Sequence, residues 1–255
     1  MSNIVIIGAG NVGYHLAIQL SKKNHTVLQV YSRTLARAEE IAMACGAKAI
    51  DDVKNINPDG DIYLMAIKDD RVEKLALKLK LSKKIVAHTS GSLPIAILSS
   101  ASENYGVFYP FQTFSRMKQL DLSEVPICVD GNNDYVKEEL TKLGKSLSHH
   151  VISLNEHKRL ALHLSGVFAN NFPNYLFSIA GNILDQEGLS FDLLKPLITE
   201  TTNKAIEIGP KIAQTGPAKR GDDKIIKLHM EFLKKHPDLQ QVYELLSRSI
   251  EKENK

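Results

Sequence analysis

The chain has 255 residues, 43% of them hydrophobic, which is enough for one large domain and a second, smaller one. Its net charge of +3 is small and its lysines are dispersed, which argues against a nucleic-acid-binding protein. No apolar run reaches the length of a membrane span, and Cys45 and Cys128 have neither a partner spacing nor the neighbours of a zinc site. We expect a cytoplasmic protein with no signal peptide and no metal.

An apolar strand over residues 3–7 leads directly into a glycine pattern at the start of a predicted helix, residues 12–22. The spacing Gly8-x-Gly10-x-x-Gly13 is typical of loops that hold a dinucleotide pyrophosphate at a helix N-terminus. The alternative is a tight turn that uses glycine only for packing. The predicted cofactor-binding residues of this loop are Gly8, Gly10, Asn11, Val12 and Gly13.

The first half of the chain alternates between strand-like and helix-like patterns, which favours a parallel sheet with helices on both faces. The further predicted strands are residues 26–31, 61–67, 84–88, 106–109, 127–129 and 150–152. The further predicted helices are residues 35–45, 71–79 and 135–143. Ligands of such sheets bind beyond the carboxyl ends of the strands, so the loops there are the candidate sites.

The end of the second predicted strand carries Ser32, Arg33 and Thr34, and no acidic residue follows until Glu39. An acid at this position selects NAD because it accepts hydrogen bonds from both ribose hydroxyls, whereas hydroxyls and an arginine suit a 2′-phosphate. The sequence therefore predicts NADP as the cofactor. Ser32 or Thr34 can also cap the next helix, and the two roles are compatible.

Two polar loops follow the next predicted strands. Asp69 is expected to N-cap the helix after it, which we favour over a chemical role. Residues 88–92 carry hydroxyls that would face the nicotinamide half of the cofactor, with Ser90 as a weaker catalytic candidate. A structural turn, with His88 as a hydrogen-bonded core residue, is the alternative.

Residues 108–115 contain four aromatic side chains within seven positions. Such a loop can form the wall of a dry pocket beside the nicotinamide, where Gln112, Thr113 and Ser115 would orient a substrate. Packing between domains explains the same residues equally well.

After about residue 153 only helical patterns remain, separated by glycine and proline. We therefore expect an α/β fold in which a doubly wound parallel Rossmann sheet, residues 1–153, is followed by an all-α C-terminal domain, residues 154–255. The expected helices of the second domain are residues 155–171, 174–187, 191–208, 222–235 and 237–250.

On the first of these helices, polar residues recur at intervals of four, three and four, so they share one face. Arg159, His163, Gly166 and Asn170 form this polar stripe. A histidine exchanges protons near neutral pH, so His163 is a candidate proton donor, and Asn170 can orient a carbonyl group. A structural histidine is the alternative.

Taken together, these residues resemble a family of Rossmann-like proteins with a helical domain of the DUF2520 type. That family lies within the wider group of 6-phosphogluconate dehydrogenase, β-hydroxyacid dehydrogenase and pyrroline-5-carboxylate reductase. The segments that carry the resemblance are residues 8–13, 32–34, 88–91, 110–114, 169–171 and 215–222.

The resemblance implies NADP(H) binding, a homodimer formed through the helical domain and an active site between the two domains. It also exposes a departure, because dehydrogenases of the wider group carry a catalytic lysine four residues before an asparagine. If Asn170 is that asparagine, the lysine position holds Gly166; if Asn171 is, it holds Val167.

We expect an NADP-dependent oxidoreductase that reduces the C=O or C=N bond of a small anionic metabolite, with His163, Asn170 and Ser90 as catalytic candidates. One alternative is a sensor that binds NADP(H) without turnover, which the missing lysine favours. Another is a reductase that passes hydride from a deazaflavin to NADP.

Overall fold

The computed structural model describes residues 1–253, and the chain folds into two compact units, Met1–Tyr175 and Leu176–Lys255. Strands occur in the described part only before residue 154, where the sequence predicts the change to helices. The described strands are β1 (Asn3–Ile7), β2 (Thr26–Tyr31), β3 (Lys48–Ile50), β4 (Ile62–Met65), β5 (Ile85–His88), β6 (Asn104–Pro110), β7 (Ile127–Gly131) and β8 (Val151–Ser153). The proposed domain boundary at residue 153 stays a prediction.

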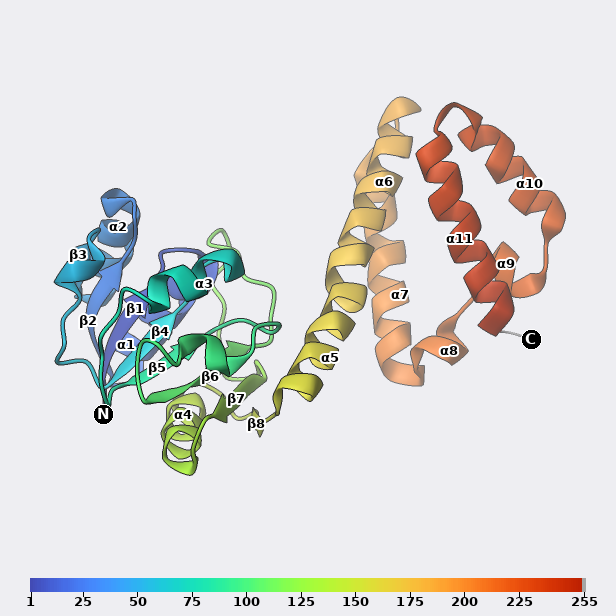
Figure 1. Ribbon diagram of the computed structural model, residues 1–255. Helices are drawn as coiled ribbons and strands as arrows, with labels where there is room; N and C mark the ends of the chain where they lie inside the picture. The colour runs from blue at the N-terminus through green and yellow to red at the C-terminus, as the bar shows by residue number, and fades with distance from the viewer. Residues whose placement is uncertain (254–255) are drawn as a thin grey trace. The chain divides into compact units, whose positions relative to one another are not determined.

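The strands form one sheet in the order β3-β2-β1-β4-β5-β6-β7-β8 (Figure 1). From β1 the chain adds strands first on one side and then, from β4, on the other. The ligand crevice of such sheets opens at this reversal. All neighbouring strands are parallel except β6 and β7. The α/β fold with a Rossmann-type sheet is confirmed, and the antiparallel pair is an addition to the prediction.

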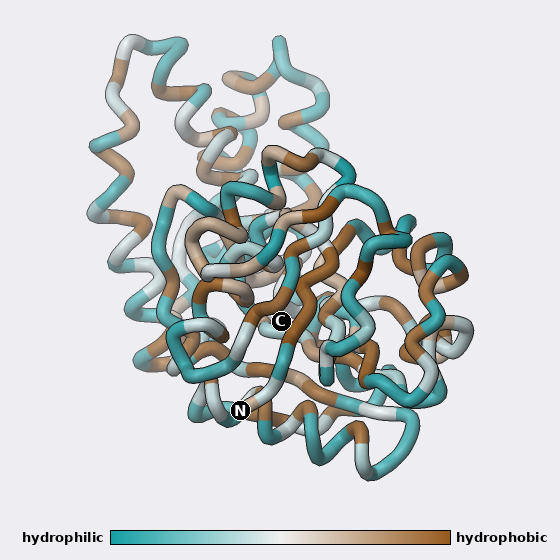
Figure 2. The backbone as a smooth tube through the Cα atoms, turned by 90° about the vertical axis from the view of Figure 1, so that its left-hand side faces the viewer, coloured by the Kyte–Doolittle hydropathy of each residue, from teal (hydrophilic) through white to brown (hydrophobic). Residues whose placement is uncertain are grey.

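Side chains of the central strands alternate between two apolar cores, one on each face of the sheet. Ile4 and Ile6 point into one core, whereas Val5 and Ile7 point into the other. Hydrophobic residues therefore run continuously along the central strands, as Figure 2 shows in brown. The described helices before β8 are α1 (Asn11–Lys22), α2 (Leu35–Cys45), α3 (Asp69–Ala76) and α4 (Asp134–Leu147).

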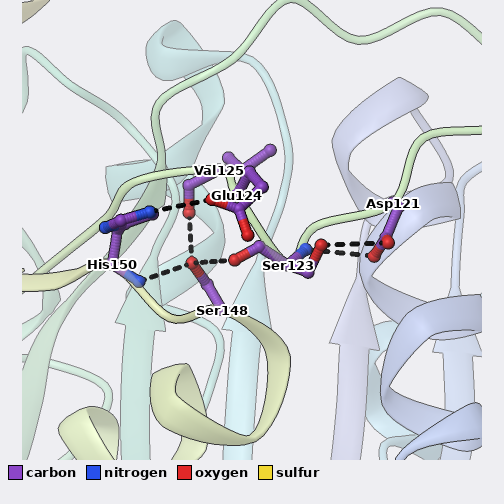
Figure 3. Close-up of polar contacts among 6 residues, drawn as sticks. All are labelled: Asp121, Ser123, Glu124, Val125, Ser148 and His150. Atoms are coloured by element: carbon purple, nitrogen blue, oxygen red, sulfur yellow. Dashed lines mark hydrogen bonds and ion pairs between the residues drawn. The ribbon is translucent and has the colours of Figure 1, made fainter.

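Residues 111–126 connect β6 to β7, and we call this segment the strap. Its two ends meet, because the Phe111 N–H donates to the Pro126 carbonyl (2.7 Å). Figure 3 shows the contacts of its far end: the buried Ser148 hydroxyl donates to the Val125 carbonyl (2.6 Å), and the His150 N–H donates to Ser148 Oγ (3.0 Å). The strap is therefore fixed at both ends.

The helical region begins with α5 (Glu156–Gly166), which continues without a break through a π-helical turn, η3 (Val167–Asn171), into α6 (Phe172–Gln186) (Figure 1). The predicted break before residue 174 is wrong. Pro173 directly follows a π-helical turn, where the regular hydrogen-bond ladder of the helix is already interrupted, so the helix continues although this residue has no N–H. The wider turn before it is closed by a bond from the Phe172 N–H to the Val167 carbonyl.

The remaining helices are α7 (Lys195–Ile208), α8 (Pro210–Ala213), α9 (Pro217–Arg220), α10 (Asp223–Phe232) and α11 (Pro237–Glu253). The short α8 and α9 lie between the predicted helices 191–208 and 222–235, in a segment rich in glycine and proline for which the sequence predicts no helix. Within residues 1–253, no helix combines the length and apolarity that crossing a bilayer requires.

Candidate functional site

The loop after β1 accepts only glycine at two of its three predicted positions. Gly8 has φ +126°, and a Cβ there would lie 2.2 Å from the Ala66 carbonyl oxygen. A Cβ on Gly13 would lie 2.0 Å from the Gly8 carbonyl oxygen. Gly10 is different, because the nearest atom to its Cβ position is 4.0 Å away. The space beside Gly10 is thus open, while Gly8 and Gly13 pack the loop against β4 and against itself.

The N-terminus of α1 has the properties of an anion-binding site. Gly10 is its N-cap, makes no side-chain capping bond, and no acidic residue occupies the first turn. Backbone N–H groups at such an end carry partial positive charge. Gly10, Asn11 and Val12 line a cavity of about 650 Å³, while the Asn11 amide also donates to the Phe114 carbonyl (2.8 Å).

The turn after β2 is ordered by its own backbone. The Ser32 N–H donates to the Ile50 carbonyl (3.0 Å), and the Thr34 N–H donates to Ser32 Oγ (3.2 Å). Thr34 is the N-cap of α2 by position, but its side chain makes no capping bond, and the Arg33 side chain is exposed. Ser32, Arg33 and Thr34 do not line the cavity, and they lie at the end of the strand next to β1.

The cavity lies wholly within residues 1–175, at the carboxyl ends of the central strands. Its lining comes from the glycine loop, from the loops after β4 and β5, from the end of β6 with the strap, and from α5 with η3. The lining segments are residues 10–12, 66–69, 89–91, 109–114 and 163–171. The crevice is where the strand order of a Rossmann sheet places its ligand.

His163 on α5 faces Tyr109 at the end of β6. The two are joined by a hydrogen bond between the Tyr109 hydroxyl and His163 Nδ1 (3.0 Å), and their rings lie edge to face. Burial raises the pKa of Tyr109 to about 12, with smaller contributions from the charges of Cys128 and Asp69. Tyr109 therefore keeps its proton at neutral pH and can donate it to Nδ1 of His163 whenever that nitrogen carries no proton. Within residues 1–253, Nε2 of His163 has no hydrogen-bond partner.

Two glycines allow close packing at the polar stripe of the helix: Gly91 lies against His163, and Gly166 of the stripe lies against Phe111. A Cβ on Gly91 would lie 2.8 Å from the His163 ring, and one on Gly166 would lie 2.6 Å from the Phe111 ring. Gly166 therefore has no room for a lysine while Phe111 stays in place. In η3, Ala169, Asn170 and Asn171 all line the cavity, because the wide turn brings consecutive residues toward one side.

Ser90 is surrounded by partners. Its hydroxyl donates to Asp69 Oδ2 (2.7 Å) and accepts the N–H groups of Ser92 (3.0 Å) and Leu93 (3.1 Å). These bonds hold the loop after β5 in shape, and the catalytic role of Ser90 stays a prediction. Asp69 is the first residue of α3 and Lys68 is its N-cap, so the expected capping by Asp69 is wrong. The Asp69 carboxylate instead fixes Ser90.

Below this loop lies a buried pair, His88 and Arg159. His88 accepts the Ser90 N–H at Nδ1 (3.2 Å), and Arg159 donates through Nη2 to the Leu93 carbonyl. Burial, and then the Arg159 charge, lower the pKa of His88 to about 4, while burial lowers the pKa of Arg159. His88 is thus neutral at pH 7. Through these two hydrogen bonds His88 and Arg159 hold the backbone of the loop after β5.

The sequence does not identify three of the cavity residues as functional groups. Tyr109 was only one member of an aromatic loop, and nothing in the sequence pairs it with His163, 54 positions away. Lys68, an exposed cation of the lining, follows β4 and so is remote from the helix on which a lysine was sought. Asp69 was assigned to capping. Among the residues described, no cluster of three His, Cys, Asp or Glu side chains could hold a metal ion.

Comparison with known proteins matches both halves of the chain to families. Residues 3–90 match the family described as NADP oxidoreductase, coenzyme F420-dependent, and residues 125–250 match a domain of unknown function, DUF2520. Among curated proteins, the glutamyl-tRNA reductase of Methanosarcina mazei is 34% identical over 64 residues. That match spans 24% of this chain and only 14% of the relative's length.

Solved structures match almost the whole chain. A Bacteroides fragilis protein named as a candidate NADP oxidoreductase is 37% identical, with 98% of each chain covered and a TM-score of 0.94. A reductive aminase of Aspergillus terreus, solved with NADPH and ethyl-5-oxohexanoate, is 20% identical with 99% and 93% covered and a TM-score of 0.67. The pyrroline-5-carboxylate reductase of Streptococcus pyogenes is 13% identical with 98% of each chain covered and a TM-score of 0.61.

The last two likenesses concern the fold alone, whereas the first extends to sequence over the full length. The resemblance drawn from the motifs is confirmed, and with it the α/β sheet followed by helices. The chain belongs to the family of NAD(P)-dependent oxidoreductases that join a Rossmann-type NADP oxidoreductase domain to a DUF2520 domain.

Proposed function

We propose that the protein is an NADP-dependent reductase that transfers hydride to the C=O or C=N bond of a small, anionic metabolite. The observation that carries the proposal is a cavity lined by the uncapped N-terminus of α1 on one side and by His163 on the other. The cradle fits a dinucleotide, because the space beside Gly10 is open and lets the backbone of the loop come close to a phosphate.

Gly10, Asn11 and Val12 would hold the pyrophosphate through the α1 N-terminus, and Ser32, Arg33 and Thr34 would hold the 2′-phosphate. When bound, the reduced nicotinamide supplies the hydride. NADP is favoured over NAD by the absence of an acid in the turn after β2 and by the names of the Rossmann family and of the B. fragilis relative.

His163 is the proton donor in this proposal. The hydrogen bond with the Tyr109 hydroxyl holds the ring at Nδ1, so the protonated imidazole would give its Nε2 proton to the oxygen or nitrogen of the reduced bond and be left neutral. Asn170, on the same wall, would orient the substrate through its amide. Lys68 supplies the positive charge that an anionic substrate requires.

The decisive experiment follows NADPH absorbance over keto acids, cyclic imines and a reduced deazaflavin with NADP. His163→Ala should lower kcat between about 10² and 10⁴-fold while NADPH binding is unchanged, since general acids contribute that much. His157→Ala is the control, because His157 is an exposed histidine of the same helix. Undiminished turnover in His163→Ala would exclude His163 from the chemistry.

The choice of cofactor is tested separately with Arg33→Ala. Loss of a charge-assisted phosphate contact costs about 1.5–3 kcal/mol, so NADPH affinity should fall roughly 10- to 100-fold. NADH affinity should be unchanged, because NADH lacks the 2′-phosphate. An unchanged ratio of the two affinities would refute the NADP assignment.

One observation favours a second function, a sensor that binds NADP(H) without turnover. The position at which the wider group carries its catalytic lysine is held by Gly166 if Asn170 is the matching asparagine and by Val167 if Asn171 is, and Gly166 lies against Phe111. Tight NADPH binding with no turnover on any member of the panel would support the sensor and exclude the reductase.

We also propose that the protein is a homodimer formed through its helical region. Leu197, Ile206 and Ile212 on α7 and α8 are 62%, 78% and 75% exposed, which is unusual for large apolar side chains. Ile206→Glu should shift the sedimentation equilibrium toward monomer, because it places a charge on the proposed apolar interface. A monomeric wild-type protein at micromolar concentration would contradict this proposal. The cytoplasmic location stays a prediction.

A further inference from the structure

The strap crosses α1 and is held there by a ladder of side chains. Asn11, His15 and Gln19 are spaced by four residues, so they lie on one face of the helix. Each contacts a strap carbonyl: Asn11 that of Phe114 (2.8 Å), His15 that of Ser115 (2.9 Å) and Gln19 that of Leu120 (2.7 Å). All three bonds leave the strap's own side chains available for other contacts.

The ladder brings one strap side chain, Arg116, onto the glycine loop. Its Nη2 donates to the Ala9 carbonyl, between Gly8 and Gly10, and its Cζ lies 5.3 Å from the centre of the Tyr14 ring. Its Nη1 pairs with Glu40 Oε2 on α2 at 2.6 Å. The guanidinium therefore contacts the residue directly before Gly10, the N-cap at which the proposed pyrophosphate would bind.

We propose that Arg116 is a phosphate-binding residue of the dinucleotide site, which exchanges Glu40 for the pyrophosphate when the cofactor binds. The inference rests on the proposed function, since it assumes a dinucleotide at the α1 N-terminus. A guanidinium fits phosphate oxygens with two parallel hydrogen bonds, and the doubly charged pyrophosphate outcompetes one carboxylate.

The present partner of Arg116 is well suited to such an exchange. The Glu40 side chain is 55% exposed, and ion pairs in that environment contribute little to stability because water screens them. Arg116 itself is 26% exposed, so it is accessible to a ligand and yet held in place by Ala9 and Tyr14. If Arg116 served only to hold the strap, loss of its ion pair with Glu40 should impair that role. If Arg116 binds phosphate, that role does not require Glu40.

Binding measurements on purified protein test the proposal, with NADPH, NADH, ADP-ribose and 2′-AMP as probes. Arg116→Gln should weaken NADPH, NADH and ADP-ribose alike, by about tenfold or more, because all three carry the pyrophosphate. Its effect on 2′-AMP should be negligible. Arg33→Ala should show the opposite pattern, weakening NADPH and 2′-AMP only. Arg116→Lys should retain part of the affinity, since it keeps the charge without the planar fork.

Two variants separate phosphate binding from mere support of the strap. Lys118→Gln removes the same charge from an exposed strap position and should leave every affinity unchanged. Glu40→Gln breaks the ion pair but removes a competing anion, so NADPH affinity should be equal or higher. Thermal unfolding of each variant checks that the fold is intact.

The results of these binding measurements test the role of Arg116 separately from the proposed function. Wild-type affinity in Arg116→Gln, or equal weakening in Arg116→Gln and Glu40→Gln, would overturn the role of Arg116 while leaving the proposed function standing. A wild-type protein that binds none of the dinucleotides would overturn both.

Discussion

The two walls of the cavity are built in different ways. The glycine-loop wall consists of backbone, and Gly8 and Gly13 are required there because a Cβ would meet carbonyl oxygens at 2.2 and 2.0 Å. The other wall carries the side chains of His163 and Asn170 on the helix that runs from α5 into a π-helical turn, and Tyr109 of β6 holds His163. The first wall is defined by backbone sterics, within the loop at Gly13 and against the Ala66 carbonyl at Gly8, and the second by contacts between side chains.

This contrast matches a division of labour. In the proposed function, backbone N–H groups would recognise a phosphate that every dinucleotide shares, so a local motif would be sufficient for binding. The proposed proton transfer would require one atom at one place, and the hydrogen bond of the Tyr109 hydroxyl to Nδ1 fixes the His163 ring. A common type of cofactor site can therefore be joined to chemistry that differs between relatives.

The strongest test of the contrast replaces glycines of the loop. Gly13→Ala places a methyl group against the rigid Gly8 carbonyl and should destabilise the protein by about 3 kcal/mol or more, with loss of NADPH binding. Gly10→Ala is the matched variant: its φ of −84° suits alanine, so stability should fall by about 1 kcal/mol or less. NADPH affinity of Gly10→Ala should nevertheless fall at least about tenfold, because the methyl occupies phosphate space. Denaturant unfolding and calorimetry measure both.

If Gly13→Ala unfolds at the wild-type denaturant concentration, the steric account of this wall is wrong. If Gly10→Ala binds NADPH as well as the wild type, the pyrophosphate does not approach the loop at Gly10.

Acid should destabilise the protein through His88, which supports the loop after β5 that lines the cavity. The pKa of His88 is lowered to about 4 in the folded state from 6.5, so the unfolded state binds more protons between these values. The contribution of neutral His88 is complete above pH 6.5 and is lost as the pH falls through about 4, by about 3 kcal/mol. Urea unfolding from pH 7 to pH 4 measures this loss.

His88→Asn is the reference, because its amide oxygen can accept the Ser90 N–H without titrating in this range. The wild type should lose more stability with acid than His88→Asn does. Parallel pH dependences of the two proteins would show that His88 does not titrate as described.

The smallest expected effect concerns the positioning of His163. Tyr109→Phe removes the hydroxyl from Nδ1 and should lower kcat about tenfold, about 1.4 kcal/mol, and change the pH profile of kcat. The KM for NADPH should be unchanged, because the glycine-loop wall is intact. Tyr105→Phe, on the same strand, is the control. An unchanged pH profile would mean that Tyr109 does not control the protonation of His163.

The fold was predictable wherever one short segment carries its own signal. The apolar runs of β1 and β2 and the glycines between them identify the Rossmann-type sheet without reference to the rest of the chain. β3 escaped prediction because its three residues, Lys-Ala-Ile, include a single β-branched side chain, whereas the equally short β8 includes two. The continuity of α5, η3 and α6 escaped it because proline commonly ends a helix, and the sequence does not show the π-helical turn that precedes Pro173.

The sequence by itself determined the family, the sheet and the glycine loop, because these depend on local sterics and on the periodicity of apolar residues. The tertiary structure alone decided which polar groups meet across the cavity. Tyr109 and His163 are 54 residues apart, Asp69 and Ser90 are 21 apart, and Arg116 reaches Ala9 over 107. Such pairs form because the carboxyl ends of parallel strands converge on one edge of the sheet, and a sequence does not show that convergence residue by residue.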